Sequence, residues 1–299
     1  MNGILCIDKP QDFTSFDVVA VMKRLLCTRK VGHTGTLDPM ATGVLPILAG
    51  SATRAAELLP SHDKEYEAGF QLGITTDTQD IWGTVVESRP VFSKKDEIQA
   101  LLPRFTGEIL QLPPMYSAVK KDGKRLYELA RQGIQVEREA RKVTVFTLAL
   151  TGAREETGEY TLSISCSAGT YVRTLIHDLG QALGCGAVMT SLRRTKACGF
   201  SLEDCLTLEE ARALSEKGTL GDRLLPVDAG LSCYPAVQVT DAQFTRFLNG
   251  GALFLARVNQ APKTHGAFVR VYDSKGKFAG LGMVDENAQE LKVKRIFSE

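Results

Sequence analysis

A segment rich in glycine, threonine and proline, residues 32–43, constrains the fold of this chain more than any other stretch. It reads Gly-His-Thr-Gly-Thr-Leu-Asp-Pro-Met-Ala-Thr-Gly, and its three glycines allow backbone turns that other residues resist. Pro39 fixes its own φ angle and favours an extended conformation for Asp38. We therefore predict that residues 29–43 form a structured loop, which holds one carboxylate at a defined place.

Asp38 has two interpretations. A carboxylate can act as a nucleophile or a general base, whereas an isolated aspartate in a loop more often stabilises a turn or caps a helix. An aspartic protease would carry two Asp-Thr-Gly loops, and this chain has none. A glycosidase would need a second, partnered carboxylate, which the sequence does not indicate. From the residues alone, both the catalytic and the turn-stabilising interpretations stay open.

Apolar periodicity predicts a chain of mixed α and β structure. Helices are expected after Thr14-Ser15 and over 96–105, 127–132, 171–183 and 207–217. Strands are expected over 4–7, 66–72, 83–87, 143–150 and 160–167. From about residue 237 a β pattern begins again, with strands expected over 267–272, 278–283 and 291–296. The 299 residues therefore predict two domains, 1–232 and a small β-rich domain over 233–299.

The charges of the chain are segregated along the sequence. The formal net charge of +1 excludes a strongly basic nucleic-acid coat protein. Residues 115–145, however, hold eight basic and four acidic side chains, while residues 63–108 hold five basic and nine acidic ones. A basic stripe backed by acidic surface gives local affinity for a polyanion despite overall neutrality.

The cysteines and the N-terminal residues predict the compartment. The seven cysteines are odd in number and none forms a C-x-x-C pair, which argues against a zinc ribbon or a disulfide framework and suits a reducing cytosol. The first residues lack the basic and apolar regions of a signal peptide, and no apolar run approaches the ~20 residues that span a bilayer. We expect a soluble cytoplasmic protein with no membrane association.

The string G-H-x-G-x-L-D-P-x-A-x-G-x-L over residues 32–45 resembles the catalytic motif of the TruB family of tRNA pseudouridine-55 synthases. Further segments resemble other motifs of that family, in order, over roughly residues 3–230. They are Asp8-Lys9-Pro10 with Thr14-Ser15, Lys64 to Gly83, Pro114 to Tyr127, Gly169 to Gly180, and Leu192-Arg193-Arg194.

The resemblance implies an α+β fold, in which helices flank a mixed, mostly antiparallel sheet. It implies isomerisation of uridine to pseudouridine in the tRNA T-loop: the glycosidic bond at N1 breaks and a carbon–carbon bond forms at C5. Because no redox change occurs, we expect no cofactor and no metal. The chain also has no dinucleotide fingerprint, P-loop or metal-ligand spacing.

The resemblance also assigns three catalytic residues. Asp38 is the essential carboxylate, either bonded covalently to the substrate or promoting loss of a sugar proton. Arg173 pairs with Asp38 and keeps it ionised, since a guanidinium can hold both carboxylate oxygens. Tyr66 stacks on the uracil or acts as a base. The alternatives are a phosphate-binding or solvated Arg173 and a Tyr66 that only fills the core.

The target base must be flipped out of a folded loop, which costs a few kcal/mol. By resemblance, His33 inserts into the T-loop, Tyr171 and Leu192 line the uracil pocket, and Lys64 also belongs to the substrate-binding residues. Asp80 orients either the RNA loop or the active site. His33 could instead be an ordinary surface residue, and Tyr171 and Leu192 could be core.

RNA-backbone contacts are expected from a basic insertion over about 111–142, which in the family closes over the RNA. Basic side chains neutralise phosphate, and Gly123 permits bending. The alternative is a solvated basic helix and loop. The expected contact residues are Lys120, Lys121, Lys124 and Arg125, together with Arg193.

The C-terminal domain resembles a PUA-type RNA-binding domain in Val269 to Asp273, Gly276-x-Phe278 and Gly280 to Gly282. It would grip the acceptor stem. One departure from the family lies at position 12, where Asp replaces the usual glycine. Aspartate tolerates left-handed backbone better than most residues, so we expect the turn to persist.

The expected partner is the T-arm of tRNA, bound by a monomer that needs no protein partner. Two alternatives are a non-catalytic tRNA-binding or tRNA-folding module on the same fold and a guide-RNA-dependent subunit. The presence of Asp38, Tyr66 and Arg173 favours an enzyme. The basic insertion and the lack of lysine-rich tails favour one that acts alone.

Overall fold

The computed structural model describes residues 1–59 and 63–297, and these form two compact units. The first unit comprises residues 1–38, 44–59 and 198–297. The second comprises residues 39–43 and 63–197. In the described part of the chain, every helix is too short or too polar to cross a membrane.

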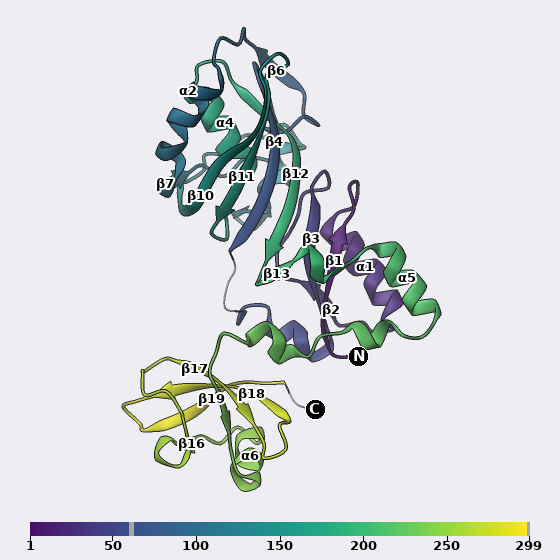
Figure 1. Cartoon of the computed structure of the whole chain (residues 1–299), viewed down its shortest axis with the longest axis vertical. Coiled ribbons are helices and arrows are strands. Elements are labelled where there is room, and N and C mark those ends of the chain that lie inside the picture. Colours follow the sequence, from purple (N-terminus) through teal and green to yellow (C-terminus); the bar gives the residue numbers. More distant parts are fainter. Residues whose placement is uncertain (60–62, 298–299) are drawn as a thin grey trace. The chain divides into compact units, whose positions relative to one another are not determined.

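The first unit begins with a small sheet and two helices (Figure 1). Its strands are β1 (Gly3–Lys9), β2 (Val31–His33), β13 (Phe200–Ser201), β14 (Cys205–Leu206) and most of β3 (Thr42–Ala49). Strand β14 runs parallel to β1, and β2 runs antiparallel to β3. The helices are α1 (Ser15–Leu25) and α5 (Leu208–Glu216), as predicted, with the short helices η1 (Gly50–Ala55), η3 (Leu202–Asp204), η4 (Leu220–Arg223) and η5 (Val227–Leu231).

Helix α1 starts where it does because of a reciprocal cap. The Asp17 N–H donates to the Thr14 hydroxyl at 3.0 Å, and the Thr14 N–H donates to the Asp17 carboxylate at 2.8 Å. This arrangement satisfies two backbone donors that the first helical turn leaves without partners. Val18 and Met22 then fall on the buried side and pack into the core shared with β1 and α5.

The second unit is built on five long strands joined antiparallel, in the order β12-β4-β11-β10-β7. Thr42 and Gly43, at the start of β3, add a parallel pairing to β12. The strands are β4 (Lys64–Leu72), β7 (Gly107–Gln111), β10 (Arg141–Arg154), β11 (Glu159–Cys166) and β12 (Ala187–Ala197), with the hairpins β5 (Ile74–Thr76)–β6 (Val85–Ser88) and β8 (Lys120–Lys121)–β9 (Lys124–Arg125).

One face of this sheet is buried under helices. On β4 the side chains of Tyr66, Ala68, Phe70 and Leu72 are buried, whereas the alternating positions are more exposed. Helix α4 (Val172–Ala182) packs on β12 and β4, and α2 (Lys95–Leu101) packs against α4 and β10. Figure 1 shows both helices on the same side of the long strands. The unit also contains α3 (Leu126–Ala130) and η2 (Leu102–Phe105).

The last part of the chain forms a separate five-stranded sheet, in the order β15-β17-β18-β19-β16. Its elements are β15 (Ala236–Gln238), α6 (Asp241–Leu248), β16 (Leu253–Phe254), η6 (Leu255–Arg257), β17 (Phe268–Tyr272), β18 (Phe278–Asp285) and β19 (Glu290–Ile296). Phe247 of α6 packs with Val269, Val271 and Leu291 in its core. The predicted β-rich C-terminal domain is confirmed, while its boundary at residue 233 stays a prediction.

The structure confirms the α+β fold with a mixed, mostly antiparallel sheet, and it adds elements that were not predicted. Strands β3, β7 and β12 and helix α6 were missed, and the predicted loop over 29–43 begins with β2 and ends inside β3. At the position where the family usually has glycine, Asp12 adopts a left-handed φ of 66°. The turn is therefore retained, as expected from the tolerance of aspartate for this conformation.

Candidate active site

The loop that carries Asp38 is anchored to the start of helix α1. The Leu37 N–H donates to the Ser15 hydroxyl at 2.8 Å, and that hydroxyl donates to the Leu37 carbonyl at 3.2 Å. Ser15 and Leu37 are buried, and Asp38, the next residue, is half-buried. A buried reciprocal clamp thus fixes the backbone directly before the carboxylate. Sequence reasoning noted Thr14-Ser15 as part of a motif but gave Ser15 no role.

His33 ends strand β2, opposite Ile47 of β3. Its imidazole meets the Phe16 ring edge to face, with centroids 5.4 Å apart. Phe16, on the first turn of α1, is 63% exposed. His33 therefore belongs to an aromatic pair that reaches the surface of the first unit, which is compatible with its predicted insertion between bases.

In the second unit, the turn between β5 and β6 is organised around the buried side chain of Asp80. The Thr76 hydroxyl donates to the Asp80 carbonyl at 2.7 Å, and the Thr78 hydroxyl donates to its carboxylate at 2.7 Å. The Trp82 N–H donates to the same carboxylate oxygen at 3.1 Å. At Gly83, a Cβ would lie 2.2 Å from the Thr78 hydroxyl, so this position requires glycine.

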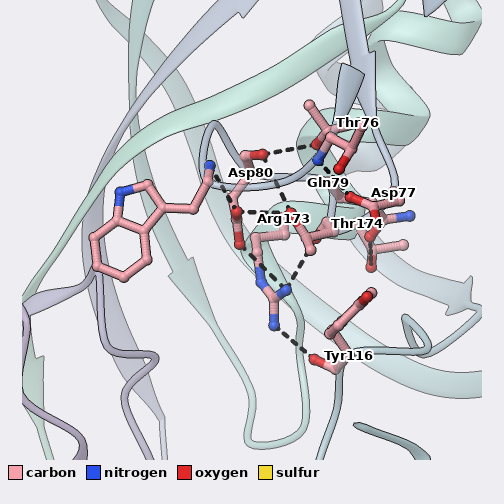
Figure 2. A network of polar contacts seen from close by, with 10 residues as sticks. Thr76, Asp77, Gln79, Asp80, Tyr116, Arg173 and Thr174 are labelled. Carbon is pink, nitrogen blue, oxygen red and sulfur yellow. Dashed lines mark hydrogen bonds and ion pairs between the residues drawn. The ribbon is translucent and has the colours of Figure 1, made fainter. Parts of the chain in front are cut away.

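Arg173, the second residue of α4, is buried against this turn (Figure 2). One guanidinium nitrogen donates to the Thr78 carbonyl at 2.9 Å and lies 3.4 Å from the Asp80 carboxylate. The other donates to the Tyr116 carbonyl at 3.0 Å. The Arg173 and Asp80 side chains are only 5% and 10% exposed, so water screens the ion pair little.

The predicted partner of Arg173 was Asp38, and within its own unit Arg173 also forms an ion pair with Asp80. Sequence reasoning singled out Asp80 as an orienting residue without connecting it to Arg173, because the two lie 93 positions apart. Asp38 belongs to the other compact unit, so its pairing with Arg173 stays a prediction.

Tyr171 is fixed through its backbone by a residue that sequence reasoning missed. The Tyr171 N–H donates to the Gln111 side-chain oxygen at 2.7 Å, and the Gln111 amide nitrogen donates to the Tyr171 carbonyl at 3.0 Å. Gln111 ends β7 and is only 2% exposed. Its single sequence signal was its place at the start of the basic insertion.

Tyr66 and Leu192 come together on one face of the β4–β12 pair. Leu192 lies directly opposite Ala68, and Tyr66 is two residues from Ala68 on the same strand. Side chains with this register project from the same face, as diagonal neighbours. Both are buried, and Lys64 is half-buried at the start of β4.

The predicted RNA-backbone residues differ in their surroundings. Lys120, Lys121 and Lys124 are exposed on the β8–β9 hairpin, and Arg125 is half-buried, with its guanidinium donating to the Tyr127 hydroxyl at 2.9 Å. Arg193 is also half-buried and donates to the Thr42 hydroxyl at 3.2 Å. The exposed hairpin lysines are therefore better placed to meet phosphate than Arg193.

Burial shifts the pKa values of titratable groups in the elements beside these residues. Burial raises the pKa of Asp178 in α4, and burial raises the pKa of the Cys166 thiol in β11 to about 11. A thiol with this pKa is protonated at neutral pH, so Cys166 is a poor nucleophile. Among the side chains of residues 1–59 and 63–297, no three His, Cys, Asp or Glu are grouped to hold a metal ion.

Comparison with known proteins places these residues in a family. The model of the TruB family pseudouridylate synthase N-terminal domain matches residues 23–172. The tRNA pseudouridylate synthase B C-terminal domain matches residues 173–232, and the C-terminal domain of pseudouridine synthase II TruB matches residues 235–297.

Full-length relatives and solved structures are also similar to the chain. A protein named tRNA pseudouridine synthase B from Ectopseudomonas mendocina (strain ymp) is 48% identical, covering 100% of this chain and 96% of the relative. One of the same name from Burkholderia lata (strain 383) is 46% identical, covering 92% of this chain and 84% of the relative.

Among solved structures, a Cbf5–Nop10–Gar1 complex contains a chain with a TM-score of 0.75 and 27% identity, covering 99% of this chain and 85% of its own length. An H/ACA RNP bound to a substrate RNA containing 2′-deoxyuridine gives a TM-score of 0.74 at 25% identity, with the same two coverages. These structures share the fold over nearly the whole chain. The matched family models, the full-length relatives and the shared fold agree, and the chain belongs to the TruB family of pseudouridylate synthases.

Proposed function

We propose that this protein isomerises a T-loop uridine of tRNA, at position 55, to pseudouridine. The observation that carries the proposal is the buried Arg173–Asp80 pair, formed by two motif segments of a chain whose full-length relatives are named tRNA pseudouridine synthase B. In the reaction, the bond from C1′ to N1 of uracil breaks and a bond from C1′ to C5 forms. C5 loses a proton and N1 gains one, so the atoms balance without redox chemistry and no cofactor is required.

Asp38 is the essential carboxylate in this proposal, and Arg173 holds it. A guanidinium carries five N–H donors, so its bonds to Asp80, Thr78 and Tyr116 are compatible with a second carboxylate. The Asp80 contact fixes the guanidinium plane before substrate arrives. A cation beside Asp38 would favour the ionised form of that carboxylate.

The substrate-binding roles follow from the same proposal. Tyr66 stacks on the uracil, and Leu192 lines the pocket beside it, which is supported by their common face on β4 and β12. Tyr171 lines the other side, its backbone fixed by Gln111. His33 takes the stacking position that the flipped base leaves, and Lys64 contacts the substrate at the start of β4.

Phosphate contacts come from the β8–β9 hairpin, through Lys120, Lys121, Lys124 and Arg125, with a smaller contribution from Arg193. The exposure of the three lysines supports this role, because an exposed ammonium can release counterions from the RNA when it binds. The C-terminal domain over 233–299 grips the acceptor stem.

We also propose that the protein works in the cytoplasm as a monomer without a protein partner. Relatives that cover nearly the whole chain carry the name of a tRNA-modifying enzyme, which supports the cytoplasmic part of this proposal. The chain of similar fold in the Cbf5–Nop10–Gar1 complex is assembled with other proteins, so independence needs a direct test.

The test uses the purified chain alone, with an unmodified tRNA transcript and mapping of pseudouridine. We expect modification at the T-loop uridine, and none with Asp38→Asn, while the variant binds tRNA within about tenfold of wild type. Retained activity in Asp38→Asn would exclude the proposed role of that carboxylate. Binding without any modification by the wild-type chain would favour the tRNA-folding module.

A further inference from the structure

The turn that holds Asp80 also presents Trp82, the single tryptophan of the chain. Half of the Trp82 side chain is exposed, as is nearly half of the neighbouring Ile81. Tryptophan is a large apolar residue that normally buries most of its surface, so its exposure beside a buried ion pair calls for an explanation.

The backbone that carries Trp82 is held by several contacts. Its N–H donates to the Asp80 carboxylate at 3.1 Å, and the Ile81 N–H donates to the Met189 carbonyl of β12 at 2.9 Å. The Gly83 N–H donates to the Asp80 carbonyl at 3.1 Å. The turn therefore fixes the backbone from which the indole projects before any ligand binds, which lowers the entropic cost of a stacking contact.

The ring faces of Trp82 meet no other aromatic ring or cation within residues 1–59 and 63–297. The same turn carries Asp77, whose carboxylate accepts from the Thr84 N–H at 2.8 Å, whereas Glu87 on β6 is paired with Arg89 at 2.8 Å. The Asp77 carboxylate disfavours a phosphate group here. It does not disfavour an uncharged base, which every aromatic face can stack upon.

We propose that Trp82 is an RNA-binding residue, whose indole stacks on an unpaired base of the tRNA close to the isomerised uridine. The inference rests on the proposed function and adds a contact to it. Through its N–H bond to Asp80, the same turn links the stacked base to the Arg173–Asp80 pair. Trp82 is thus a binding residue that reports on the site without taking part in the chemistry.

Intrinsic fluorescence tests this directly, because all tryptophan emission comes from Trp82. Titration of the full-length protein with unmodified tRNA should quench or shift that emission at the same concentrations at which filter binding detects the complex. Trp82→Ala should weaken tRNA binding about tenfold, while Trp82→Phe, which keeps a stacking ring, should stay within about threefold. Phe92→Ala, at an aromatic side chain that is 84% exposed, is the matched control and should bind as wild type.

Thermal unfolding of each variant separates loss of fold from loss of contact. Unchanged Trp82 emission in a tRNA complex that filter binding detects would overturn the proposal, as would wild-type affinity in a folded Trp82→Ala. In both cases pseudouridine formation would continue, so the proposed function would stand. The exposed Trp82 surface would then be assigned to a protein contact instead of an RNA base. Failure of the wild-type chain to bind or modify tRNA would instead reject the proposed function.

Discussion

At the scale of single residues, Asp80 has two structural roles. One carboxylate oxygen accepts from Thr78 and Trp82 and shapes the turn, and the other lies 3.4 Å from Arg173. Asparagine can keep the first set of contacts but cannot carry the charge. The turn and the ion pair can therefore be separated by one substitution.

We predict that Asp80→Asn slows pseudouridine formation by at least about tenfold, because a less well-fixed guanidinium positions its partners poorly. It should also lower the free energy of unfolding by about 1–3 kcal/mol, since a buried charge loses its counter-ion. Single-turnover kinetics and urea unfolding measure the two effects. Asp77→Asn, at an exposed position in the same turn, should leave both near wild type. Equal behaviour of the two variants would contradict the role of Asp80.

Gly43 illustrates a second constraint at this scale. Its φ is +105°, and a Cβ would lie 2.1 Å from the carbonyl oxygen of the buried Arg194 on β12. Gly43→Ala should therefore cost about 2 kcal/mol or more of stability, through strain and overpacking. Gly32→Ala is the matched control, because no atom lies within 4 Å of its Cβ position. Thermal unfolding compares the two variants. Equal midpoint temperatures would show that the sheet adjusts its backbone at position 43 to accommodate a Cβ atom at little cost.

At the scale of elements, β17 is tied to the segment before the C-terminal domain by half-buried polar contacts. The Tyr272 hydroxyl donates to the Asp228 carboxylate of η5 at 2.7 Å, and the Arg270 guanidinium donates to the Tyr234 carbonyl at 2.9 Å. Burial, followed by the bond to Asp228, raises the pKa of Tyr272 to about 12.

This shift predicts a stability loss at alkaline pH. An unfolded tyrosine ionises near pH 10, before the folded one does. The stabilisation by Tyr272 is therefore complete below about pH 10 and is lost as the pH rises towards 12. Urea unfolding at several pH values should show a steeper loss for wild type than for Tyr272→Phe over this interval. If the free energy of unfolding of wild type and of Tyr272→Phe fell in parallel with pH, the contact with Asp228 would not favour the protonated Tyr272 hydroxyl.

The elements that sequence patterns predicted well are those with regular alternation or clear caps. Strand β11 alternates buried and exposed side chains, and α1 begins at a capping pair. Strand β12 escaped prediction because register shifts after Met189 and Arg194 break its alternation. Pro46, inside β3, obscured that strand, since proline cannot donate to the ladder.

For the candidate site, the sequence motifs singled out residues but not their contacts, and the roles of those residues stay predictions. The motifs marked Arg173 and Asp80 separately, but only the folded chain shows that they pair. The Gln111 clamp on Tyr171 could not be foreseen either, because it connects residues 60 positions apart through a side chain without charge or motif.

At the scale of the whole molecule, the near-zero net charge of +1 hides a local concentration of basic residues. The exposed lysines of the β8–β9 hairpin supply part of it. If they meet phosphates, the double variant Lys120→Ala/Lys124→Ala should reduce the slope of log K against log salt by about 2. Lys142→Ala should change it less, because Lys142 already pairs with Glu108 at 2.8 Å. Filter binding of tRNA across a salt series gives both slopes. An unchanged slope in the double variant would exclude the β8–β9 hairpin as a source of phosphate contacts.

The Gln111 clamp has a consequence for how such a chain can vary in length. Gln111 is the last residue of β7, and beyond it the chain leaves the sheet for the basic insertion. Because its amide grips both backbone groups of Tyr171, insertions or deletions before this point would be transmitted to the start of α4 and to Arg173. Beyond Gln111, the Tyr116 carbonyl also accepts from Arg173, so changes near Tyr116 would reach the same side chain. Gln111 and Tyr116 together therefore limit where this part of the chain can be remodelled, whether by evolution or by grafting, without disturbing Arg173.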